Sequence, residues 1–117
     1  MTISIVNEAM LSKAGYVGCV SGNNTDKSKI FTYHIAETGA PIIEESPLVM
    51  ECIVKTAGFE SFICRIDAVY AEDAILNSSR KIDYEQLKPV LFEMPTYQYL
   101  RTGDVIGDCM KINQKED

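Results

Sequence analysis

The chain has 117 residues, of which 46% are hydrophobic and 24% are charged, and its formal net charge is −6. This length predicts one domain with a modest hydrophobic core, and this composition excludes a disordered chain. The acidic balance, without a cluster of lysine or arginine, argues against binding to nucleic acid or to an anionic membrane surface. No apolar segment approaches the roughly 20 residues that span a bilayer.

The cysteines give no sign of a metal centre. Cys19, Cys52, Cys64 and Cys109 form no CxxC pair, and His34 is the single histidine. Zinc sites need close pairs of ligands, so we expect no metal. The first residues lack the basic region and the long apolar region of a signal peptide. Together these features predict reduced thiols in the cytoplasm.

The first third of the chain predicts short elements around a polar loop. Residues 2–6 alternate as in a strand, and Asn7 is suited to cap a short helix over residues 8–14. The segment GCVSGNNTDKSK, residues 18–29, then predicts a loop. Residues 30–36 can form a strand, and the TGAP sequence that follows turns the chain.

The middle of the chain predicts a long antiparallel hairpin. LVMECIVK (residues 48–55) and SFICRIDAVYAE (residues 61–72) both alternate with the period of a strand. Gly58 lies between them as the expected centre of the turn. That register would place Cys52 opposite Cys64, and we expect two core thiols there rather than a disulfide, because cytosolic bridges are rare.

The last third predicts short elements again. Residues 73–80 form a turn or short helix, and Asp83 begins a second helix that Pro89 ends. Two short extended segments follow within residues 89–112. A strand-rich chain with a few short helices predicts a small antiparallel barrel rather than βαβ units.

No catalytic group is recognisable. The carboxylate pairs at residues 44–45 and 72–73 would point to opposite sides of a strand, so we interpret them as solvated surface. His34 has no recognisable partner. The serines lack a GxSxG context, and neither GxGxxG nor GxxxxGK[ST] occurs.

Two features could bind a ligand, although the residues alone favour simpler interpretations. The loop offers a Ser21 hydroxyl, a Lys27 ammonium and possible backbone N–H donors, which suit a phosphate, but its composition is also that of an ordinary turn. Tyr97 and Tyr99 are expected on one face of a strand near Arg101. They could stack on a planar ring, but packing against the barrel or a partner subunit is the favoured alternative.

Four segments resemble a known family. ISIVNEAM, GCVSGNNTDK, GAPIIEESPLVMECIV and FICRIDAVYAEDAIL, the last followed by KIDYEQLKPVLFEMPTYQYLRTGDVIG, occur in the order of the flavin reductase-like FMN-binding split barrels. That family includes flavoredoxin and related NAD(P)H:FMN oxidoreductases. The resemblance implies a mainly β fold with short helices, an antiparallel Greek-key split barrel. It also implies a homodimer with FMN at its interface.

The resemblance also implies a cofactor site. Ser21, Gly22 and Lys27 fall on the loop that helps to hold the flavin phosphate in the family. Tyr97 and Arg101 fall on the tail that can approach the flavin. No catalytic acid or base is implied, because the hydride chemistry belongs to the flavin.

The chain departs from the family at its amino-terminal end. Residues 1–117 are expected to form a single domain that corresponds to the carboxy-terminal two-thirds of the family's domain, without its first barrel strands; whether Met1 is the authentic start is open. Asp26 is expected to order the loop, and Ser28 stands where an aromatic residue often occurs. The unpaired edge should be covered by dimerisation or strand exchange.

Two functions therefore follow from the resemblance. The first is an FMN-binding flavoprotein, either an NAD(P)H-dependent flavin reductase or a flavin-mediated electron carrier, whose affinity for FMN is weak or absent. The alternative is a truncated, non-catalytic remnant that acts as a dimeric structural or interaction protein without a cofactor. The sequence leaves open whether the chain is an enzyme.

Overall fold

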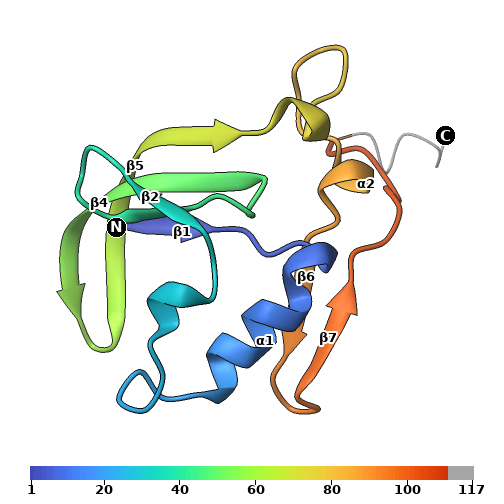
Figure 1. Ribbon diagram of the computed structural model, residues 1–117. Coiled ribbons are helices and arrows are strands. Elements are labelled where there is room, and N and C mark those ends of the chain that lie inside the picture. Colours follow the sequence, from blue (N-terminus) through green and yellow to red (C-terminus); the bar gives the residue numbers. More distant parts are fainter. Residues whose placement is uncertain (111–117) are drawn as a thin grey trace, which may run out of the picture.

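A computed structural model describes residues 1–110, which form three antiparallel sheets with short helices between them (Figure 1). The strands are β1 (Thr2–Ser4), β4 (Leu48–Gly58) and β5 (Ser61–Ala71) in one sheet, β2 (Tyr33–Ile35) and β3 (Pro41–Ile43) in the second, and β6 (Val90–Glu93) and β7 (Gln98–Arg101) in the third. The helices are α1 (Leu11–Cys19), α2 (Tyr84–Leu87) and three 3-10 turns, η1 (Glu8–Met10), η2 (Lys27–Lys29) and η3 (Asp73–Ile75). The predicted mainly β, antiparallel fold is confirmed. Within residues 1–110 the sheets do not close into a barrel.

The hairpin of β4 and β5 turns one residue later than the sequence suggested. Gly58 pairs with Ser61, so Phe59 and Glu60 form the two-residue turn. Their φ angles are 52° and 59°, the left-handed values that a type I′ hairpin turn requires at both central positions. Gly58 therefore does not lie at the centre of the turn. Phe59 and Glu60, which both carry side chains, occupy the two strained left-handed positions.

The register of this hairpin corrects the expected cysteine pair. Cys52 pairs with Ile66, and Cys64 pairs with Val54, so the predicted Cys52–Cys64 pairing is wrong. The displaced turn and two β-bulges, between residues 51–52 and 54–56, shift the partners. All four cysteines are free thiols.

Helix α1 is longer than predicted. Asn7 caps the preceding turn η1 as expected, because its side-chain oxygen accepts a hydrogen bond from the Met10 amide at 3.0 Å. The helix then continues to Cys19 instead of ending at residue 14. Glycine in a helix interior costs about 1 kcal/mol, but packing can offset that cost. A side chain at Gly15 would begin 3.6 Å from the Tyr99 hydroxyl, so the helix packs closely on β7.

The largest core lies at the end of the sheet where α2 packs. Leu48, Ile75 and Leu87 form a buried cluster, and Ile5 and Ile82 pack against it. The short helix α2 begins as the sequence predicts: Asp83 accepts a hydrogen bond from the Glu85 amide at 3.0 Å. That cap orients α2 so that Leu87 enters the core.

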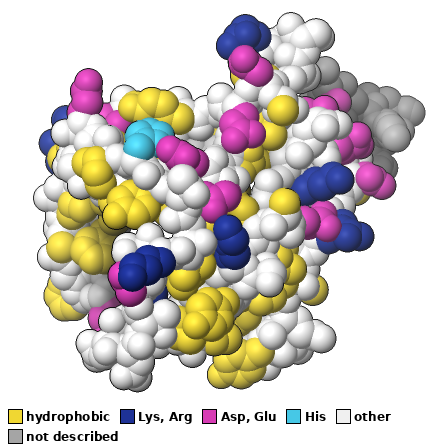
Figure 2. Space-filling model, in the orientation of Figure 1, with side chains coloured by type: hydrophobic (Ala, Val, Ile, Leu, Met, Phe, Trp, Pro, Cys, Tyr) yellow, Lys and Arg dark blue, Asp and Glu magenta, His cyan; other side chains and the backbone are white. Residues whose placement is uncertain are grey.

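Much apolar surface is left uncovered elsewhere. Strand β5 is at the edge of its sheet, and no described residue pairs with its outer side. Figure 2 shows hydrophobic side chains at the surface along the left, over the β4–β5 hairpin, and at the bottom, where α1 meets β6 and β7. None of the described helices is long and apolar enough to cross a membrane.

Candidate functional site

The loop between α1 and η2 is held by its own short hydrogen bonds. The Ser21 hydroxyl oxygen accepts a bond from the Asn23 amide at 3.1 Å. The Ser21 carbonyl accepts bonds from the amides of Asn24 and Thr25 at 3.1 and 3.0 Å. Because the hydroxyl acts here only as an acceptor, its own proton remains available to a ligand. The Gly22 amide makes no hydrogen bond to the described part of the chain.

Two charged residues fix the end of this loop. The Lys27 ammonium donates to the Val17 carbonyl at 2.9 Å, in the last turn of α1. Asp26 accepts from the amide and the hydroxyl of Ser28, at 3.1 and 2.5 Å, so its predicted loop-ordering role is confirmed. The Lys27 ammonium keeps two further N–H donors, and it lies near a helix carboxy-terminus that favours a cation.

Lys27 borders a small pocket with aromatic walls, which we call the Lys27 pocket. Its volume is about 370 Å³, and its lining includes Ser28, Phe31, Tyr33 and Ile43. The Lys13 Nζ atom lies 5.6 Å from the centre of the Phe31 ring. A cation beside flat apolar walls matches the needs of a ligand that joins an anion to a planar ring.

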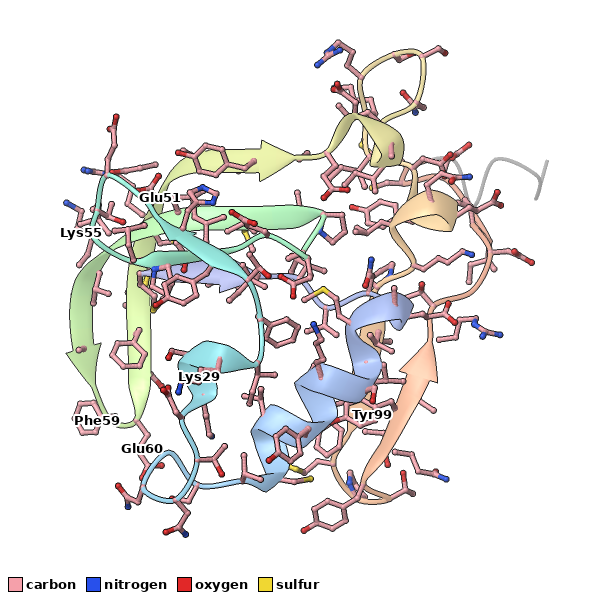
Figure 3. All side chains as sticks on the ribbon, in the orientation of Figure 1. Lys29, Glu51, Lys55, Phe59, Glu60 and Tyr99 are labelled. Atoms are coloured by element: carbon pink, nitrogen blue, oxygen red, sulfur yellow. The ribbon has the colours of Figure 1, made fainter. Side chains whose placement is uncertain are left out.

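A second pocket opens between α1 and the β6–β7 hairpin, and we call it the helix–hairpin pocket. It has a volume of about 630 Å³ and is mainly apolar. Its walls are small residues of α1 and aromatic residues of the hairpin: Ala14, Gly15, Gly18, Cys19, Phe92, Tyr97 and Tyr99. Figure 3 shows Tyr99 against α1.

The two predicted tyrosines both lie against Phe92, but not as neighbours on one strand. Tyr97 lies in the turn before β7, with φ 54°, so the prediction that it shares a strand face with Tyr99 is wrong. Both rings nevertheless contact Phe92, with centroid distances of 6.4 Å for Tyr97 and 5.2 Å for Tyr99. The hairpin therefore presents an aromatic wall to the helix–hairpin pocket.

Arg101 is bound to an acidic side chain instead of facing either pocket. Its guanidinium contacts Glu8 through two nitrogens, at 3.0 and 2.7 Å. This hydrogen bonding lowers the pKa of the Glu8 carboxyl and raises the pKa of Arg101. Arg101 borders a third pocket, of about 690 Å³, together with Lys88 and Asp104.

The structure does not gather the five predicted site residues into one cavity. Lys27 lines the Lys27 pocket, Tyr97 lines the helix–hairpin pocket and Arg101 lines the third. Ser21 and Gly22 lie on the loop that joins the end of α1 to Lys27. Helix α1 connects two of these places, since its last turn holds Lys27 and one of its faces lines the helix–hairpin pocket.

The carboxylates at residues 44 and 45 have separate partners and form no acid–base pair. The Glu44 carboxylate lies 3.3 Å from the His34 ring, so the view that His34 lacks a partner is wrong. Glu45 accepts from the Thr32 amide at 2.9 Å and from Lys13 at 3.2 Å. The Thr32 hydrogen bond, more than Lys13, lowers the pKa of Glu45.

Sequence reasoning missed one buried carboxylate. Glu51 is only 4% exposed; it accepts from the Tyr70 hydroxyl at 2.8 Å and from the Thr38 amide at 3.1 Å. These bonds lower the pKa of Glu51, the Tyr70 bond most, and raise the pKa of Tyr70. Glu51 lies on the same face of β4 as the buried Val49, and this alternation in the sequence could have indicated that Glu51 is buried. The network joins β4, β5 and the turn after β2.

The chain is similar to solved flavoproteins over almost its whole length. It is 31% identical to a flavoredoxin from Methanosarcina acetivorans, with a TM-score of 0.89. This match covers 99% of this chain and 64% of the flavoredoxin. For flavoredoxin of Desulfovibrio vulgaris the identity is 27% and the TM-score 0.87, over 96% of this chain and 63% of that one. An FMN-binding protein from Thermus thermophilus, 19% identical with a TM-score of 0.71 over 92% of this chain and 61% of that one, shares the fold.

The match is thus to part of each relative, since the chain spans just under two-thirds of the length of the flavoredoxins. No protein-family model matches the sequence, and no curated protein matches it either. The resemblance seen in the sequence is nevertheless confirmed by the fold and by identities of 31% and 27% over almost the whole chain. Over the length that it spans, the chain has the fold of the flavoredoxins and resembles them in sequence, and it shares this fold with a split-barrel flavin reductase from Shewanella frigidimarina.

Proposed function

We propose that the protein is an FMN-binding flavoprotein, working as an NAD(P)H-dependent flavin reductase or as a flavin-mediated electron carrier. The observation that carries this proposal is the match to two flavoredoxins at TM-scores of 0.89 and 0.87. The Ser21–Lys27 loop supports it independently, because its free donors and the adjacent aromatic pocket suit a phosphate attached to a planar ring.

Each predicted residue has a role in this proposal. Lys27 supplies charge to the flavin phosphate, and Ser21 and the Gly22 amide donate hydrogen bonds to it. Tyr97 offers a ring face for stacking. The Nε and Nη2 atoms of Arg101 are bound to Glu8, so its Nη1 atom is the donor that it can offer to a ligand without breaking that pair.

The bound flavin would supply the hydride or electron chemistry, and the chain would hold and orient it. The loop donors fix the phosphate end of the cofactor, so that the ring is held at one place and in one orientation. The apolar walls of the pocket exclude water from the ring. No residue needs to act as an acid or base, which agrees with the separate, structurally engaged carboxylates.

The wider setting follows from the same family. A homodimer is proposed, with residues 1–117 as one split-barrel domain and NAD(P)H as a transient reductant. The free state of all four cysteines supports a reducing compartment, and we propose the cytoplasm. Because the chain spans only 64% of the first flavoredoxin, these whole-protein properties rest on the family rather than on the residues present.

Flavin retention tests the proposal directly. Purified protein mixed with FMN and then desalted should keep the flavin absorbance band, and flavin fluorescence should change on titration. NADH and NADPH oxidation are measured in the same samples. A colourless protein that changes neither fluorescence nor NAD(P)H oxidation would instead support the non-catalytic alternative.

The phosphate role of the loop has its own test. Lys27→Ala should weaken FMN binding by about 1.5–3 kcal/mol, because a charge-assisted hydrogen bond is lost. Fluorescence titration measures this, and Lys29→Ala is the matched control, since Lys29 is exposed and lies outside the Lys27 pocket. Equal affinities for the two variants would mean that Lys27 does not bind the phosphate.

A further inference from the structure

The edge strand β5 is the least protected part of the structure. It is eleven residues long and one of its sides is unpaired within residues 1–110. Several of its apolar side chains are more than half exposed: Phe62, Ile63, Ile66 and Val69. A long, apolar, open edge is a template for another strand, so natural proteins protect or pair such edges.

The accessible surface of the chain is larger than that of a typical globular monomer of the same mass. The accessible surface is 9234 Å², whereas a globular monomer of 13.0 kDa is expected to expose about 6,300 Å². The excess is about 2,900 Å². An obligate dimer buries roughly 2,000–5,000 Å² in total, so the excess is sufficient for one.

The sequence of β5 is complementary to itself when it is read in the opposite direction. With Ile66 as the centre, Arg65 stands opposite Asp67, Cys64 opposite Ala68 and Ile63 opposite Val69. The next pair outward is aromatic, Phe62 with Tyr70, and Ser61 with Ala71 ends the strand. The charged pair is thus opposite in sign, and the other positions pair small, β-branched or aromatic residues with residues of the same type, which is the pattern that stabilises antiparallel strands.

We propose that two copies of this chain pair edge to edge through β5, antiparallel and with a two-fold axis at Ile66. This names the surface of the proposed homodimer and rests on that part of the proposed function, not on flavin binding. A two-fold axis makes the interface isologous, so each Arg65 faces the Asp67 of the other copy.

Two features of β5 bear on this geometry. Arg65 and Asp67 already form an ion pair within one strand, at 2.6 Å, so both charged groups lie on the same side and are positioned to exchange partners. The bulge on β5 leaves Asp67 between the pairs made by Ile66 and Ala68. The two-fold axis places the bulges of the two copies next to each other, at the centre of the proposed pairing.

Charge reversal tests the pairing. Arg65→Asp places four carboxylates around the axis, and Asp67→Arg places four guanidinium groups there. Each single variant should raise the dimer dissociation constant by at least about tenfold, since like charges that face each other across an interface are strongly unfavourable. An equimolar mixture of the two variants should recover a heterodimer, because every facing pair is then opposite in charge.

The measurement is sedimentation equilibrium, with circular dichroism to check folding. Arg80→Asp is the control for the change in net charge, because Arg80 is exposed on the loop before α2 and should leave the dimer unchanged. The double variant Arg65→Asp/Asp67→Arg keeps both kinds of pair and should also remain dimeric.

The outcomes separate the surface from the oligomeric state. If the wild type is a dimer and neither single variant changes the dimer dissociation constant, the β5 interface is wrong but the homodimer remains supported. A wild-type monomer at all concentrations would overturn both, and would mean that another chain or segment covers the edge. If the single variants do not fold, hydrogen exchange of wild-type β5 decides. Protection that is lost on dilution supports the pairing, and fast exchange at every concentration contradicts it.

Discussion

The two halves of strand β4 differ sharply in their surroundings. In the first half, Val49, Glu51 and Cys52 are each less than 5% exposed, and Leu48 joins the core with α2. In the second half, from Val54 to the turn, the side chains are exposed. Both halves pair with β5, so hydrogen bonding alone does not distinguish them.

This difference indicates that one end of the β4–β5 hairpin contributes mainly to stability, whereas the other is free to contribute to binding. The end near α2 holds the packed side chains, and the far end holds the exposed hairpin turn. Figure 3 shows Phe59 at the tip of the hairpin, directed away from the rest of the chain. Regions with few packed contacts are the ones that open or rearrange most easily, and binding surfaces are drawn from them.

Removing a side chain from the packed end should have the largest effect. Leu87 is 1% exposed, and Leu87→Ala should lower the free energy of unfolding by about 2–5 kcal/mol through lost burial and a cavity. Urea denaturation measures the change. Leu91→Ala is the control, because Leu91 is 54% exposed and should cost far less. Equal losses would show that the core does not lie where the cluster places it.

Relieving the turn at the open end should have a smaller effect of opposite sign. Phe59→Asn/Glu60→Gly replaces two strained left-handed residues with the pair that a type I′ turn prefers. The free energy of unfolding should rise by about 1 kcal/mol, as measured by urea denaturation. Glu72→Gly, at a residue whose φ is −69°, is the control and should bring no gain. A loss in the double variant would mean that the Phe59 side chain contributes to stability.

The smallest effect concerns pH. The pKa of Glu51 is lower in the folded protein than its ordinary value of 4.5, chiefly because of the Tyr70 hydrogen bond. The ionised carboxylate therefore stabilises the fold above pH 4.5, and this contribution is lost as the pH falls through the lowered value.

Urea denaturation from pH 7 downward measures this contribution. Tyr70→Phe should flatten the acid side of the stability curve, because it removes the main cause of the shift. Tyr84→Phe is the control, since Tyr84 is exposed and does not contact Glu51. An unchanged acid limb in Tyr70→Phe would show that the hydrogen bond does not set the pKa.

Local patterns predicted most of the elements. The alternation along β4 and β5, the Asn7 and Asp83 caps and two short extended segments near the end are all present in the structure. Errors arose where distant contacts override local preference. The first helix was expected to end at residue 14, but packing against Tyr99 allows α1 to continue to Cys19.

The site was harder to predict than the fold, for the same reason. Arg101 meets Glu8 across almost the entire chain, and Glu51 is buried by the hydroxyl of Tyr70 on a neighbouring strand. The partner of each residue is not indicated by its neighbours in the sequence, although the alternation along β4 places Glu51 on the same face as Val49. The loop of residues 18–29 was recognisable because its residues are contiguous in the sequence and resemble one segment of the family.

The pairing of β1 with β4 has a consequence for how the chain folds. Thr2 pairs with Glu51, and the buried Ser46 hydroxyl donates to the Ile5 carbonyl at 2.7 Å. These contacts join residues that are far apart in the sequence, so they should form late in folding. The β4–β5 hairpin, whose strands are neighbours in sequence, can form first. The loop that carries Ser21 and Lys27 lies inside the segment that β1 closes. Its arrangement should therefore appear only in the last step of folding, and ligand affinity would report when that step is complete.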